Sequence, residues 1–210
     1  ITVMSRNVAG VSYCTNPAAA YGGADEETDA AFLTRYREYL QRPISSGNKN
    51  HYISWAKEVS GVAYAQCVPI WDGPGTVKVI VAGPDKDPVD EDVIGEVADH
   101  IEEERPIGAD VTVVTVTELA INVSATVTLT PGATAQAVKE ELEASLAQML
   151  LELPFGEATL VRWSRCLALL LDCEGVEDYA AFTVNSGTTN VSVGQEQTPV
   201  VGTITITEGS

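Results

Sequence analysis

The sequence has 210 residues, of which 45% are hydrophobic, and its 30 acidic and 12 basic residues give a formal net charge of −18. This composition indicates a folded globular protein with a sizeable core and excludes a disordered chain. A surface this acidic repels phosphate groups, so neither nucleic acid nor an anionic membrane is an expected partner. Solubility alone is a sufficient explanation of the acidity.

The first residues predict an extended segment, a loop and then a helix. The chain begins without Met and without a signal-peptide pattern, so we expect it to be a piece of a longer chain. The acidic run 25–29 precedes a helical pattern, and acids stabilise the positive N-terminal end of a helix. We therefore interpret this run as a helix start and not as a metal site. The apolar positions of the helix are Phe32, Leu33, Tyr36 and Leu40.

A second helix is predicted after residue 48, with Asn48 or Asn50 as its N-cap. Its apolar stripe, at steps of three and four residues, consists of Tyr52, Trp55, Ala56 and Val59. This spacing favours a packing role for Tyr52 and Trp55 over stacking on a ligand. His51 lies off the stripe, without a catalytic partner nearby in the sequence, and we expect it to be an exposed position.

Residues 61–71 and 76–83 predict two strands, joined by the sequence Asp-Gly-Pro-Gly. A phosphate-binding loop would need a helix directly after Gly75, and the next predicted helix begins only at Val89. We therefore interpret Gly73, Pro74 and Gly75 as a turn.

The middle of the chain predicts an acidic helix at 89–104, a break at 105–110 and a strand at 111–117. Residues 121–130 then alternate between apolar and polar side chains, as in a strand with one buried face. Further helices are expected at 131–152, capped by Thr134, and near 157–171. The last helix would carry Leu160, Trp163, Leu167 and Leu170 on one face. Strands are expected at 178–186 and 200–208.

This order of elements predicts an α+β protein, because the helices do not alternate one-for-one with the strands. We expect a helical N-terminal lobe followed by two strand–helix–strand units with a mostly antiparallel sheet. The predicted domain boundaries are 1–75, with a closing β-hairpin, then 76–130 and 131–210. A similarity between the segments beginning at residues 77 and 121 suggests that the two units are a duplication.

Catalytic sequence templates are absent, since the chain has no GxSxG, HExxH, P-loop or GxGxxG before a helix. Asp85, Asp87, Asp90 and Asp92, together with His100, are the candidates for a metal-dependent hydrolase. They lack the spacing of a calcium-binding loop, so a solvated acidic loop is the favoured interpretation.

The four cysteines also bear on the class of protein. No two of them have the CxxC spacing of a metal or redox site, and we expect reduced, mostly buried thiols. An extracellular binding module, the other alternative, would instead have oxidised cysteines. The cysteines are Cys14, Cys67, Cys166 and Cys173.

Several separated phrases occur together in one order: "NP…GGADEET…RY…YL", "GN…HY..WA.EV.GV", "P.WDGPGTVKV" and "RPIGADVTV". With this arrangement the chain closely resembles the baseplate J-like family of contractile phage tails and related injection machines, over residues 10–130. Members of that family usually have an additional N-terminal region.

The resemblance implies a structural protein without enzymatic activity or cofactor. It would be a baseplate wedge component that rings the hub, links it to the sheath and helps to trigger contraction. Its partners would be other baseplate and tail proteins, with a homo-oligomeric ring only in the assembled baseplate. It would be located in the virion tail and assembled in the bacterial cytoplasm.

The motif residues would have structural roles: Gly22 and Gly23 for close approach, Trp55 and Trp71 for packing, and the glycines near residue 74 for a turn. The stretch 47–79 would then be a packed elbow between lobes. The full set of motif residues is Gly22, Gly23, Asp25, Tyr52, Trp55, Trp71, Gly73, Pro74, Gly75, Arg105, Pro106 and Gly108.

Overall fold

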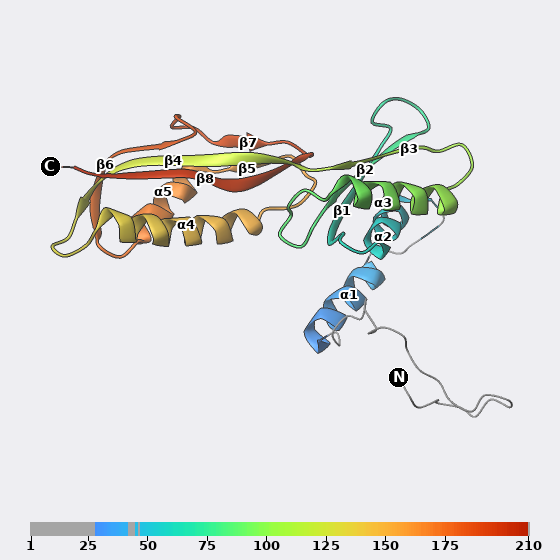
Figure 1. Ribbon diagram of the computed structural model, residues 1–210, viewed down its shortest axis with the longest axis horizontal. Coiled ribbons are helices and arrows are strands. Elements are labelled where there is room, and N and C mark those ends of the chain that lie inside the picture. The colour runs from blue at the N-terminus through green and yellow to red at the C-terminus, as the bar shows by residue number, and fades with distance from the viewer. Residues whose placement is uncertain (1–27, 42–44, 46, 210) are drawn as a thin grey trace, which may run out of the picture. The chain divides into compact units, whose positions relative to one another are not determined.

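The computed structural model describes residues 28–41, 45 and 47–209, and the chain divides into two units, Ile1–Pro43 and Ile44–Ser210 (Figure 1). In the first unit the described part is helix α1, Asp29–Gln41, which confirms the helix predicted there. The rings of Phe32 and Tyr36 stack with their centroids 6.3 Å apart. Gly22, Gly23, Asp25 and Cys14 lie outside the described residues.

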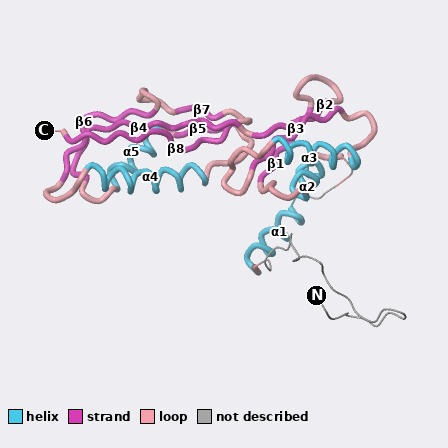
Figure 2. The backbone as a smooth tube through the Cα atoms, viewed as in Figure 1, coloured by secondary structure: helices cyan, strands magenta, loops and turns pink. Residues whose placement is uncertain are grey.

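The first half of the second unit contains a three-stranded sheet in the order β1–β2–β3 (Figure 2). Strands β1 (Tyr64–Pro69) and β2 (Thr76–Ala82) are antiparallel, whereas β3 (Asp110–Thr115) is parallel to β2. Helix α3 (Glu91–Glu104) makes the crossover that a parallel pair requires. Helix α2 (Lys49–Glu58) packs beside α3 on this sheet, and their apolar faces form one core with β2.

A second sheet has the order β6–β4–β8, with β4 (Thr117–Leu129) in the centre. Strand β6 (Val176–Val184) is antiparallel to β4, and β8 (Gln197–Glu208) is parallel to it. Helices α4 (Ala135–Leu151) and α5 (Trp163–Asp172) pack on one face of the sheet (Figure 1). The predicted alternation of β4 is confirmed, with Ile121, Val123, Ala125 and Val127 buried.

Both helix N-caps that sequence patterns suggested are present. The Asn48 side chain accepts a hydrogen bond from the backbone N–H of His51 at 2.9 Å, so Asn48 and not Asn50 caps α2. The Thr134 hydroxyl accepts one from Ala137 N at 3.2 Å and caps α4. Each side chain satisfies a backbone donor that the first helical turn leaves unpaired.

The helix predicted near 157–171 is wrong at its start. Residues Thr159–Val161 form a short strand, β5, which pairs with β7 (Val191–Val193), and α5 begins only at Trp163. Leu160 is therefore not part of a helical stripe and is 44% exposed. The partner strand lies some thirty residues away, as the register Leu160↔Ser192 shows. Local periodicity could therefore not predict this strand pairing.

The α+β class is confirmed. Among the described strands, three pairings are antiparallel and two are parallel. The division at residues 75 and 130 stays a prediction. In the part of the chain that the structure describes, no helix has both the length and the apolar character needed to cross a membrane.

Candidate functional site

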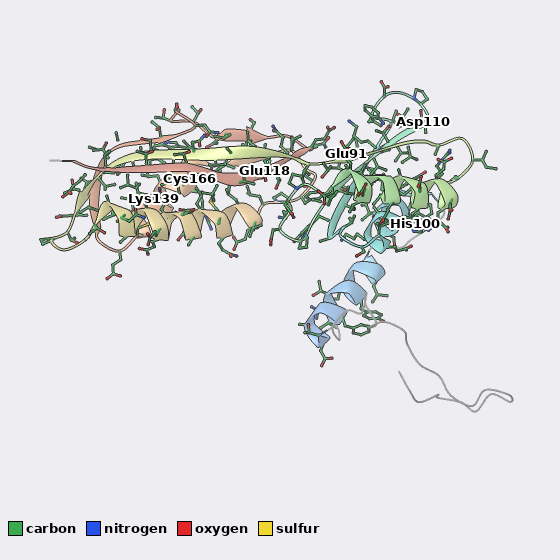
Figure 3. All side chains as sticks on the ribbon, viewed as in Figure 1. Glu91, His100, Asp110, Glu118, Lys139 and Cys166 are labelled. Carbon is green, nitrogen blue, oxygen red and sulfur yellow. The ribbon has the colours of Figure 1, made fainter. Side chains whose placement is uncertain are left out.

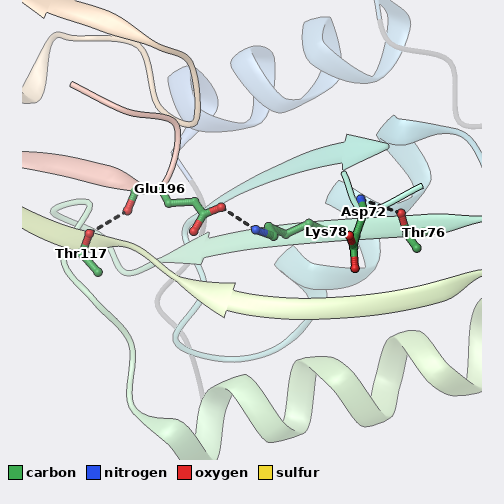
Figure 4. A network of polar contacts seen from close by, with 5 residues as sticks. All are labelled: Asp72, Thr76, Lys78, Thr117 and Glu196. Carbon is green, nitrogen blue, oxygen red and sulfur yellow. Dashed lines mark hydrogen bonds and ion pairs between the residues drawn. The ribbon is translucent and has the colours of Figure 1, made fainter. Parts of the chain in front are cut away.

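The motif residues of the second unit meet at one end of the β1–β2–β3 sheet, beginning with the β1–β2 turn. In this turn the backbone N–H of Ile70 donates to the carbonyl oxygen of Thr76 at 2.7 Å. The Thr76 hydroxyl donates to the Gly73 carbonyl at 2.7 Å. It also accepts from Asp72 N at 3.0 Å (Figure 4). Gly73 and Gly75 have φ values of 101° and 88°, which only glycine adopts without strain. The residues 72–75 thus form the expected turn.

The α3–β3 turn is held by Arg105. Its guanidinium donates to both carboxylate oxygens of Glu102 at 2.5 Å and to the backbone carbonyl of Ala109. The hydrogen bond from Arg105 holds the pKa of the Glu102 carboxyl below its usual value. Since the same side chain reaches the helix end and the loop after it, Arg105 fixes the path of the chain between α3 and β3.

The two turns lie side by side. The backbone N–H of Asp110 donates to the Gly75 carbonyl at 2.9 Å, and a Cβ atom on Gly75 would lie 3.5 Å from the carbonyl oxygen of Gly108. The phrases DGPG and RPIGAD, which are far apart in the sequence, therefore make one structural feature. We call residues 70–75 and 105–109 together the sheet tip.

The start of α2 packs against the sheet tip. A Cβ atom on Gly47 would lie only 2.6 Å from Cγ of Pro106, so glycine is required for this approach, and its φ of 71° also favours glycine. Tyr52 and Trp55 are buried and meet edge to face with ring centroids 5.1 Å apart. Burial raises the pKa of the Tyr52 hydroxyl.

The expectation that His51 is an exposed position without partners is wrong, because its side chain has two partners. Its ring stacks on Trp55 with centroids 3.8 Å apart, and its Nδ1 accepts a hydrogen bond from the backbone N–H of Gly47 at 3.3 Å. The side chain is half-buried. His51 lies off the apolar stripe of the helix, but its imidazole ring packs on the neighbouring Trp55 at the edge of the core.

Trp71 lies at the surface, in contrast to Trp55. It is 40% exposed, and the ammonium group of Lys78 lies 3.9 Å from the centroid of its ring. Lys78 also forms an ion pair with Glu196 at 2.6 Å, and the backbone carbonyl of Glu196 accepts from the Thr117 hydroxyl at 3.2 Å (Figure 4). This network connects the first sheet to the beginning of the second.

Lys86, in the loop after β2, makes a second connection, to the end of α4, and no sequence pattern pointed to it. Its side chain is buried, and its ammonium group donates to the carbonyl oxygens of Leu151 and Leu153 at 2.5 and 2.6 Å, at the C-terminal end of α4. A cation is favourable at this negative end of the helix. Burial lowers the pKa of the Lys86 ammonium group. The only signal in the sequence was a single lysine within the acidic stretch 85–92.

Apolar contacts complete this connection. The ring of Tyr64 on β1 and the ring of Phe155, in the loop after α4, have their centroids 5.5 Å apart. Both rings pack against buried residues of β2. A side chain on Gly156 would collide with the side chain of Gln66, so the loop after α4 lies directly on the first sheet. We call Lys86, the Tyr64–Phe155 contact and the Lys78–Glu196 pair together the junction.

Among the residues of the alternative hydrolase hypothesis, His100 has a different partner. His100 on α3 pairs with Glu58 on α2 at 2.9 Å, and Figure 3 shows His100 and Glu91 on different turns of α3. Among the described residues, no three His, Cys, Asp or Glu side chains are grouped so that they could hold a metal ion.

The cysteines of the described part are free and buried, as expected. Burial raises the pKa of the Cys67, Cys166 and Cys173 thiols from an ordinary 9.0 to about 11. Figure 3 shows Cys166 within the layer of the helices α4 and α5. These thiols are part of the packed interior.

Comparison with known proteins gives two adjacent matches. Residues 45–115 match the baseplate J-like central domain, and residues 121–207 match the baseplate J-like protein C-terminal domain. The chain is 31% identical over 193 residues to the phage-like element PBSX protein XkdT of Bacillus subtilis, which covers 89% of this chain and 55% of that protein. It is 50% identical over 58 residues to the baseplate protein gp47 of Escherichia phage Mu, covering 28% of this chain and 16% of gp47.

The fold is also similar to a solved structure. A chain of the anti-feeding prophage baseplate superimposes with a TM-score of 0.61 and 16% sequence identity, covering 87% of this chain and 43% of that one. The chain spans about half the length of the Bacillus subtilis relatives that it matches. In the sequence, only residues 116–120 separate the two family domains.

Proposed function

Because this chain belongs to the baseplate J-like family, we propose that it is part of a structural protein of the baseplate of a contractile phage tail or tail-like particle. The observation that carries the proposal is the pair of adjacent family domains, which together extend over residues 45–207 with a gap of only five residues. A relative named baseplate protein gp47 supports the same location. The protein would reside in the particle's baseplate after assembly in the host cytoplasm.

The roles of the motif residues support a scaffolding function without catalysis. The Arg105 guanidinium donates hydrogen bonds to Glu102 and to a backbone carbonyl. Gly75 and Gly108 allow the β1–β2 turn and the α3–β3 turn to pack closely. Tyr52 and Trp55 fill the core under α2. Each of these contacts stabilises the shape of the chain, which is what a component of a large assembly must keep under load.

We further propose that the protein acts as a wedge component that links the hub to the sheath and helps to trigger contraction. The junction supports this idea, because Lys86 and Phe155 connect the two family domains through buried contacts, and Lys78 adds an ion pair. Two domains held in this way would move together and would transmit a displacement at one end to the other.

Copies of the protein would form a ring only in the assembled baseplate, in contact with other tail proteins. Closed rings of identical subunits use the same pair of surfaces at every contact, and such interfaces are large. With a net charge of −18, the chain would need other components to offset the repulsion between copies.

Co-expression tests this function. The full-length protein that contains this chain is produced together with the proteins encoded beside it, and the tagged protein is purified at physiological salt. We expect a complex of defined stoichiometry with at least one other tail protein. If the tagged protein is purified without any of the co-expressed proteins, a role in the wedge is contradicted.

A further inference from the structure

Three large apolar side chains on the two turns of the sheet tip are exposed. Ile70 is 67% exposed, Trp71 is 40% exposed, and Ile107 is fully exposed. They come from two turns that the hydrogen bond between Asp110 N and the Gly75 carbonyl joins. Interaction surfaces expose several large apolar residues close together, whereas single exposed residues are common everywhere.

The backbone conformation at Ile70 is unfavourable for the side chain at that position. Its φ is 57°, a left-handed conformation that is unfavourable for a β-branched residue. Glycine or asparagine would form the same turn with less strain, and an isoleucine that is two-thirds exposed contributes little to a core. An unfavourable side chain kept at an exposed position is explained if something outside the chain contacts it.

The charges around the sheet tip indicate what kind of surface that is. Asp72, Glu103, Glu104 and Asp110 are all exposed on or beside the two turns (Asp110 is labelled in Figure 3). Two cations of this region are already neutralised, since Arg105 is paired with Glu102 and Lys78 with Glu196. On and beside the two turns, exposed carboxylates therefore outnumber the unpaired cations of the turns, and we call these four residues the acidic rim.

This rim makes a second copy of the chain a poor occupant. Two sheet tips facing each other would bring the same carboxylates together, in a chain whose net charge is already −18. A surface with lysine and arginine around an apolar pocket would match both the apolar centre and the acidic rim, and interfaces of this kind combine both features.

We propose that Ile70, Trp71 and Ile107 dock into an apolar pocket rimmed by basic residues on a different protein of the same baseplate. This inference rests on the proposed function. The apolar side chains supply the binding free energy, and the acidic rim supplies orientation and excludes acidic surfaces, including other copies of this chain.

Site-specific cross-linking in purified particles tests the docking. A photo-cross-linking amino acid replaces Ile107 in the full-length protein, and a matched variant carries it in place of Leu160, which is exposed on β5. We expect at least a tenfold higher yield from position 107, to one other particle protein, in a segment rich in lysine and arginine. Cross-links to a second copy, to a segment without basic residues, or at the yield of position 160 would overturn the proposal.

Incorporation of variants separates this inference from the proposed function. Ile107→Ser removes an exposed side chain, so the melting temperature should stay that of the wild type, while we expect at least a tenfold loss of incorporation into particles. Leu160→Ser should be incorporated normally. If the wild-type protein is itself absent from particles, the proposed function fails. If the wild type and Ile107→Ser are incorporated equally, only the docking proposal is overturned.

Discussion

At the scale of single residues, Trp55 and Trp71 should respond differently to truncation. Trp55 is 4% exposed between α2 and the sheet, so Trp55→Ala should lower the free energy of unfolding by about 3–5 kcal/mol. Trp71 lies at the surface under Lys78, and Trp71→Ala should cost less than about 1 kcal/mol. Urea denaturation of the two variants measures both values. Equal losses of unfolding free energy in the two variants would contradict the assignment of Trp55 to the core and Trp71 to the surface.

His51 should contribute measurably to stability, contrary to what the sequence suggested. Its stacking on Trp55 and its hydrogen bond from Gly47 are both lost in His51→Ala, with an expected cost of about 1 kcal/mol. Lys57→Ala, at an exposed position on the same helix, should stay within about 0.5 kcal/mol of the wild type. A His51 variant as stable as the Lys57 control would contradict the stacking contribution.

The buried thiols give a prediction about pH. The pKa of each described thiol is about 11 in the folded protein and near 9.0 when exposed, so the folded protein holds these protons more tightly than the unfolded chain. Their contribution to stability is present below pH 9 and should be lost as the pH rises towards about 11. In the folded protein at pH 8, a disulfide reagent should modify these three thiols slowly, and in urea quickly. Rapid modification without denaturant would contradict the burial.

At the scale of elements, the junction should depend on Lys86. In Lys86→Met the stem of the side chain is kept but the donors to the Leu151 and Leu153 carbonyls are lost, with an expected cost of about 1–3 kcal/mol. Lys57→Met, on the exposed side of α2, is the matched control and should be nearly neutral. Calorimetry of both variants checks this prediction. Equal melting temperatures would mean that the two carbonyls are satisfied by water when Lys86 is absent.

Local patterns in the sequence were sufficient for some elements. The alternation of β4 and the caps Asn48 and Thr134 were predicted because each depends on neighbours within a few residues. The parallel pairing of β4 with β8 was not, since it joins residues about 80 positions apart, such as Ser124 and Thr205. Local rules specify faces and ends of elements, and they carry no information on which distant strand becomes the partner.

The candidate site shows the same division. Turn chemistry identified Gly73 and Gly75, and the spacing of α2 identified Trp55 as a core residue. The contacts of Lys86 and Phe155 were missed, because each joins parts of the chain separated by more than sixty residues. An isolated lysine in an acidic loop has the same appearance in a sequence whether it is solvated or buried at a helix end.

At the scale of the whole molecule, the net charge should control self-association. At −18, copies of this chain repel one another, and at physiological salt the repulsion is screened beyond about 8 Å. We therefore expect a monomer or small oligomer at low salt. Light scattering over a series of salt concentrations measures this directly. A stable ring of the chain alone at low salt would show that its own contacts overcome the charge.

The most direct test of a baseplate role is the position of the full-length protein in intact particles. Particles are purified from a host that produces the tagged protein, the tag is located by gold labelling in electron micrographs, and the copy number is measured by quantitative mass spectrometry. We predict label at the baseplate end only, with a fixed number of copies per particle. Particles that are complete and contract normally without the protein, or label along the length of the tail, would contradict the account.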